Sequence, residues 1–79
     1  MKPTPHPGEH LREDVLAPLG WGVAKAADRL GVSRSTVSRL VNGRCGVSPD
    51  MARRLELAGV GTARFWIALQ ARHEQGART

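Results

Sequence analysis

The stretch from Val23 to Gly43 is VAKAADRLGVSRSTVSRLVNG, and its pattern predicts two short helices joined by a tight turn. Gly31 interrupts the pattern and can adopt the positive φ that a sharp turn requires. Ser33 opens the second helix as an N-cap, because its hydroxyl can accept a hydrogen bond from an amide of the first turn. Apolar side chains recur at helical spacing on the faces expected to be buried, and these residues are Val23, Ala26, Ala27, Leu30, Val37, Leu40 and Val41.

The second helix of this pair also has a polar face. Its side chains can form hydrogen bonds, and the two arginines among them can each bind guanine through two parallel bonds. The pair therefore carries a helix-turn-helix signature, which favours DNA recognition. The alternative interpretation is a helical corner whose arginines only form a solvated surface. The outward residues are Arg34, Ser35, Thr36, Ser38 and Arg39.

With 79 residues, the chain is long enough for one small domain. Aromatic residues make up 4 %, so aliphatic side chains and alanine must provide most of the core, which favours a helical bundle over a sheet. The net charge of +5 is concentrated, because residues 22–54 contain seven Lys and Arg against two Asp. A basic segment of this kind is typical of a phosphate-binding face, so double-stranded DNA is the expected partner.

Several classes of function find no support in the sequence. Cys45 is the single cysteine; it fits a reducing cytoplasm, and we interpret it as an incidental thiol. His6 and His10 lack further ligands at the spacing of a zinc site, so no metal or other cofactor is expected. No nucleophile, base and pocket come together, so we expect no enzyme. No apolar run approaches the ~20 residues that span a bilayer and no signal peptide is visible, so the expected location is the cytoplasm.

The sequence predicts three further helices and two tails, with a single domain at residues 8–73. The proline-rich residues 1–7 are expected to be flexible, and residues 74–79 are expected to be frayed. The first helix covers about residues 7–17 and is expected to bury Leu11, Val15 and Leu19. The next covers about residues 49–58, begins at the N-cap Ser48 and buries Met51, Ala52, Leu55 and Ala58. The last covers about residues 63–73 and begins at the N-cap Thr62.

The last helix is apolar over a broad arc. Phe65, Trp66, Ile67 and Leu69 cover more than one face, which is typical of a helix that is buried on two sides. In one interpretation, Phe65 and Leu69 complete the core of the single chain and Ile67 is simply exposed. In the other, which we favour, the chain forms a homodimer, and the residues that meet the second copy are Trp66, Ile67 and Gln70.

Seven short motifs occur in order along the chain. They are HPGE at residues 6–9, LRE at 11–13, LAPLG at 16–20, LGVSRST at 30–36, VNG at 41–43, VSPDMA at 47–52 and FWIALQ at 65–70. In this order they resemble the HigA-type antitoxins, small regulators whose helix-turn-helix belongs to the phage-repressor (XRE/Cro) class. The resemblance covers about residues 6–70, which is nearly everything between the two tails.

This resemblance implies an all-α, five-helix, phage-repressor-like helix-turn-helix domain. It also implies a homodimer that binds a palindromic operator upstream of its own operon, and a partner toxin of the RelE-like ribonuclease class that is neutralised by complex formation. By position, the outward residues of the second helix match those that face bases in such repressors. Ser33 and Asn42 match positions that usually meet phosphate, and Lys25 and Arg44 are two further candidates for phosphate contact.

Two other functions stay open at the level of the sequence. One is a stand-alone helix-turn-helix repressor without a toxin, which co-purification from the native host would distinguish. The other is a toxin-binding protein that does not bind DNA, although the positive charge of residues 22–54 argues against it. The toxin-binding surface is not identified. The acidic first helix is one candidate, because it would attract a basic ribonuclease.

Overall fold

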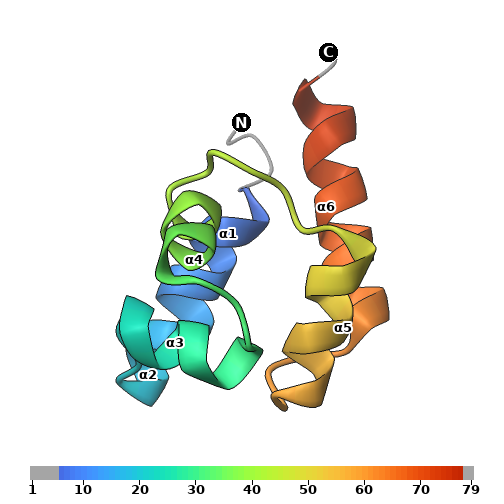
Figure 1. Cartoon of the computed structure of the whole chain (residues 1–79). Helices are drawn as coiled ribbons and strands as arrows, with labels where there is room; N and C mark the ends of the chain where they lie inside the picture. Colours follow the sequence, from blue (N-terminus) through green and yellow to red (C-terminus); the bar gives the residue numbers. More distant parts are fainter. Residues whose placement is uncertain (1–5, 78–79) are drawn as a thin grey trace.

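The computed structural model describes residues 6–77, and within this range the chain is helical with no strand (Figure 1). The elements are α1 (Pro7–His10), η1 (Leu11–Leu16), α2 (Ala17–Leu19), α3 (Val23–Leu30), α4 (Arg34–Val41), α5 (Pro49–Leu57) and α6 (Ala63–Ala77). Because α1, η1 and α2 follow one another without a break, the described residues form five helices, and the predicted fold class is confirmed. The pair α3–α4 packs with the first helix on one side, and α5 packs along α6 on the other (Figure 1).

The first helix begins with a cap formed by a residue that was predicted to belong to a flexible tail. His6 Nδ1 accepts a hydrogen bond from the Gly8 amide at 2.9 Å, and Pro7 is buried in the first turn. Partial burial, together with the nearby His73, lowers the pKa of His6 and so favours the neutral ring that can accept this bond. Residues 6 and 7 therefore belong to the fold, whereas residues 1–5 of the predicted tail lie outside the described residues.

A π-helical stretch, η1, changes which face of the first helix is buried. Leu11 and Leu16 are buried, whereas Val15 is partly buried and Leu19 is 51 % exposed. The expectation that Leu19 lies in the core is therefore wrong. A π turn closes with hydrogen bonds between residues five apart, so Leu16, five positions after Leu11, takes the place that an α-helix would give to the fourth residue.

α1 approaches the last turn of α4 closely at Gly8. A side-chain carbon at this position would overlap the backbone carbonyl group of Leu40. Only glycine, which has no such carbon, allows the two backbones to come this close. The contact places the start of the first helix against the end of α4.

The turn between α3 and α4 has the predicted geometry. Gly31 adopts a left-handed conformation with φ 69°, and Ser33 Oγ accepts a hydrogen bond from the Thr36 amide at 3.1 Å. Gly22 occupies the N-cap position of α3 and supplies no side-chain hydrogen bond there. Six of the seven residues expected on the buried faces are buried, and the exception is Val23, which is 37 % exposed.

α5 and α6 begin with the predicted caps. Ser48 Oγ accepts from the Met51 amide and Thr62 Oγ1 accepts from the Phe65 amide, both at 3.1 Å. The core face of α5 is as expected, with Met51, Ala52 and Leu55 buried and Ala58 partly buried. α6 continues to Ala77, past the expected end near residue 73. Residues 74–77 are therefore helical, and residues 78–79 lie outside the described residues.

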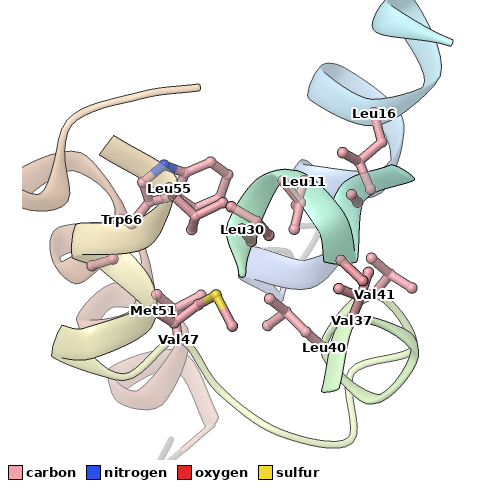
Figure 2. Packing of buried hydrophobic residues seen from close by; sticks show 13 residues of the cluster. Leu11, Leu16, Leu30, Val37, Leu40, Val41, Val47, Met51, Leu55 and Trp66 are labelled. Atoms are coloured by element: carbon pink, nitrogen blue, oxygen red, sulfur yellow. The ribbon is translucent and has the colours of Figure 1, made fainter. Parts of the chain in front are cut away.

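Trp66 belongs to the core of the single chain (Figure 2). Its side chain is fully buried in the same cluster as Leu11 and Leu55, and its Nε1 donates a hydrogen bond to the Val60 carbonyl oxygen at 3.1 Å. The interpretation that Trp66 meets a second copy is therefore wrong, because residues of its own chain enclose the ring. Phe65, assigned to the core in the alternative interpretation, is 42 % exposed. Neighbouring residues on a helix point about 100° apart, so a broad apolar arc does not decide which of two adjacent rings faces inward.

Replacing the two rings one at a time tests this placement. Trp66→Ala should lower the free energy of unfolding by about 3–5 kcal/mol, because it removes buried apolar area and leaves a cavity. Phe65→Ala should cost clearly less, because that ring is 42 % exposed. Urea denaturation followed by circular dichroism measures both losses, and equal losses would contradict the placement of the two rings.

Candidate nucleic-acid interface

The outward face of α4 borders an open hollow that also reaches the first turn of α3. The hollow is lined by Val23, Arg34, Ser35, Ser38 and Arg39. Four of the five outward residues of the predicted recognition helix therefore lie together. They are turned outward because the opposite stripe of α4 is buried in the core. The fifth, Thr36, is partly buried and does not line the hollow.

Three side chains of this face are available to a ligand. Arg34, Ser35 and Arg39 are exposed, and their side chains form no hydrogen bond or ion pair with other residues in the range 6–77. A guanidinium group carries five N–H donors in a planar fork that fits the O6 and N7 atoms of guanine. The two arginines therefore give the hollow unoccupied donors and positive charge.

The other polar side chains of α4 take part in hydrogen bonds at its ends. At the start, the hydroxyl groups of Ser33 and Thr36 lie 2.9 Å apart, in addition to the cap bond. At the end, Asn42 Nδ2 donates to the Ser38 carbonyl oxygen at 2.8 Å and lies 3.4 Å from the Ser38 hydroxyl. The cap bond satisfies a backbone amide of the first turn that the helix itself leaves without a partner, and the bonds of Asn42 add to the amide bond that Ser38 already accepts at the end of α4.

The residues expected at phosphates do not line the hollow. Lys25 on α3 and Arg44 after α4 are exposed, and neither forms an ion pair within the described part of the chain. Asn42 borders a separate hollow at the end of α4, and Ser33 caps the start of that helix. Phosphate contact by these four residues stays a prediction.

Arg54 of α5 holds the turn between α3 and α4 from outside. Its Nη1 donates to the carbonyl oxygens of Leu30 and Gly31, both at 3.1 Å, and its Nε donates to Asp50 Oδ2 at 2.9 Å. Arg54 was not among the functional residues predicted from the sequence. The one signal in the sequence is the spacing of Asp50 and Arg54, which are four residues apart on a helix and can therefore pair.

Helix α6 exposes two large apolar side chains, which point to different sides because they are two residues apart on the helix. Phe65 and Ile67 are 42 % and 45 % exposed. Gln70 is partly exposed, and its Oε1 accepts a hydrogen bond from the Val47 amide at 2.8 Å, which ties α6 to the loop after α4. Of the three residues expected at a dimer interface, Ile67 and Gln70 are therefore accessible, and Trp66 is enclosed in the core.

Among residues 6–77 there is no group of three or more His, Cys, Asp or Glu side chains that could hold a metal ion. His6 serves as a helix cap, and His10 Nδ1 lies 2.8 Å from Asp14 Oδ2. Cys45 is a free, partly buried thiol. None of the helices in this range combines the length and the apolar character needed to cross a membrane.

Comparison with known proteins gives a family match over most of the chain. A family model described as a helix-turn-helix domain matches residues 9–64. Virulence-associated protein A of Dichelobacter nodosus is 40 % identical over 72 residues, which cover 90 % of this chain and 71 % of that protein. The matched region contains the whole of the α3–α4 pair and the hollow.

Several solved structures have similar folds. The Pseudomonas aeruginosa antitoxin HigA with the higBA promoter has a TM-score of 0.90 and 36 % sequence identity, and the similarity covers 95 % of this chain and 82 % of that one. Antitoxin GraA has a TM-score of 0.92 and 38 % identity, over 98 % of this chain and 83 % of that one. The similarity therefore extends well beyond the helix-turn-helix pair to the remaining helices.

Proposed function

The chain belongs to the HigA-type antitoxins of the helix-turn-helix family, and we propose that it represses its own operon as a homodimer and neutralises a RelE-like ribonuclease toxin. Members of this family are DNA-binding regulators. The observation that carries the proposed repressor role is the hollow at α4, where two exposed arginines have no partner within the described residues. The similar Pseudomonas aeruginosa antitoxin, solved with promoter DNA, supports the same kind of target for this chain.

In the proposed complex, α4 enters the major groove of the operator. Arg34 and Arg39 bind the edges of guanine bases, and the small hydroxyl groups of Ser35 and Ser38 contact neighbouring bases. Lys25 and Arg44 bind phosphates. These contacts fix the position of the protein along the duplex but do not read the base sequence. Ser33 and Asn42 are the two caps of α4 and also contact phosphates, whereas Thr36 is partly buried and does not line the hollow.

A homodimer would present α4 twice. Successive turns of the major groove on one side of DNA lie roughly 34 Å apart, so a two-fold symmetric pair fits a palindromic operator. The exposed side chain of Ile67 on α6 is the centre of the proposed interface, with Gln70 at its edge. An apolar side chain of this kind gains free energy when a second copy covers it.

DNA binding is the first part to test. At physiological salt, the affinity of the purified protein for DNA from just upstream of its own gene should exceed its affinity for scrambled DNA by ~10³-fold or more. Its affinity should fall steeply with salt, because phosphate contacts release counterions. Arg39→Ala should cost about 1–3 kcal/mol on the upstream DNA and should relax the preference among operator variants. Fluorescence anisotropy with labelled duplexes measures all three quantities.

Arg53→Ala is the matched control, because it removes the same charge from an exposed position of α5 that does not line the hollow. It should weaken binding to upstream and scrambled DNA by the same small factor. An unchanged preference after Arg39→Ala would overturn the base-reading assignment. If the unmodified protein binds both DNAs equally and weakly, α4 is only a basic surface that does not read sequence. Toxin neutralisation is then the leading function.

The dimer is tested by placing a charge at the proposed interface. Ile67→Asp should raise the dissociation constant of the dimer by about tenfold or more, because a carboxylate would be buried there without a partner. Leu57→Asp, at an 80 % exposed position of α5, should leave the dimer intact. Sedimentation equilibrium measures both constants. A monomeric protein, or a dimer that tolerates Ile67→Asp, would contradict this interface.

The toxin is tested by purification from the native host. A tagged copy of the chain should co-purify with a ribonuclease encoded in the same operon, and RNA cleavage by that ribonuclease should be inhibited in the complex. An unrelated tagged helix-turn-helix protein, purified in the same way, is the control. Recovery of the chain alone, with specific DNA binding intact, would identify a stand-alone repressor instead.

A further inference from the structure

Val23 departs from the pattern that places the rest of α3. The sequence puts it on the buried face with Ala26, Ala27 and Leu30, and those three side chains are buried. Val23 is the first residue of α3 and is 37 % exposed. An apolar side chain that could have joined the core is therefore partly open to solvent.

The position of Val23 is informative because of its neighbours. It lines the hollow together with Arg34, Ser35, Ser38 and Arg39, so it is the one apolar side chain among the five that line it. The other large hydrophobic residues that are exposed in the described range lie elsewhere, and they are Leu19, Leu57, Phe65 and Ile67. On its other side, Val23 borders a second hollow, whose lining includes Leu16, Trp21 and Val41.

A hollow with four polar side chains and one apolar side chain matches a particular surface of DNA. The base edges in the major groove offer hydrogen-bond donors and acceptors, and their one apolar group is the C5-methyl group of thymine. Arginine and serine suit the donors and acceptors, and valine suits the methyl group. Covering both apolar groups removes them from water, which favours binding.

We propose that Val23 contacts the C5-methyl group of a thymine in each operator half-site, and is thus a specificity-determining residue outside the recognition helix. The inference rests on the proposed function, since it requires α4 to lie in the major groove. It adds to that function a prediction about the operator: a thymine must stand beside the bases that the arginines bind. The contact should contribute about fourfold in affinity, the factor expected for burying one methyl group.

A competing role for Val23 is indirect. A partly exposed valine beside an arginine can support the apolar stem of that side chain, and so orient its guanidinium group. The two roles differ in one respect. A supporting role depends on the protein alone, whereas a methyl contact depends on which base stands opposite.

The test replaces each thymine of the upstream duplex, one at a time, with deoxyuridine, which lacks only the C5-methyl group. The unmodified protein should lose about fourfold in affinity at one position in each half-site. Val23→Ala should lose a similar or larger factor on the unmodified duplex and should lose nothing further when that position is uridine. Fluorescence anisotropy titrations give the dissociation constants of the unmodified protein and of Val23→Ala on every duplex, and these constants complete the double-mutant cycle.

Two controls accompany the cycle. Val23→Ala should keep the circular dichroism spectrum and thermal melting of the unmodified protein, because alanine forms helices more readily than valine and the position is partly exposed. Leu57→Ala removes an 80 % exposed side chain from α5 and should bind every duplex as the unmodified protein does.

The outcomes separate this inference from the function on which it rests. If upstream DNA is bound no more tightly than scrambled DNA, the proposed function and the methyl contact are both overturned. If binding is specific but Val23→Ala weakens it equally with thymine and with uridine at every position, the methyl contact alone is overturned, and Val23 supports an arginine. Specific binding that is insensitive to Val23→Ala and to every uridine would likewise overturn the contact and leave the repressor role standing.

Discussion

The direction of α4 depends on how the end of α3 is held. Leu30 and Gly31 end that helix, and backbone carbonyl groups at a helix end lack partners within the helix. The guanidinium group of Arg54 binds both carbonyl oxygens, and Asp50 orients it from one turn away on α5. A turn shaped by the left-handed Gly31 is thus also fixed from a third helix. Any ligand that binds in the hollow at α4 therefore meets a surface whose angle is set by the body of the domain.

The polar residues of α4 divide into two groups by what they bind. The short side chains of Ser33, Thr36 and Asn42 form hydrogen bonds within the helix and its caps. Arg34 and Arg39, which are long and charged, form none within the described residues. A helix whose ends are already held by hydrogen bonds loses little conformational entropy when it binds a ligand. More of the free energy of the arginine contacts therefore appears as affinity.

Local features of the fold could be predicted from the sequence, and the reason is the same in each case. The turn at Gly31 and the caps at Ser33, Ser48 and Thr62 depend on residues within four positions of one another, so their hydrogen bonds follow from spacing alone. The predictions from the sequence were wrong where residue spacing alone does not determine which side chains are buried. The π-helical stretch η1 changes the number of residues per turn, which moves Leu19 out of the core and brings Leu16 into it.

By itself, the sequence determined the five helices, the turn between the two central ones, and the outward arginines of α4. Periodicity and capping encode all of these within a few residues. Only the tertiary structure decided that Trp66 faces the core while Phe65 stays partly exposed, and that Val23 opens onto the hollow. It alone paired Arg54 with carbonyl groups 24 and 23 positions away. Such contacts depend on distances between segments that are far apart in the chain, and those distances are set when the helices pack against one another.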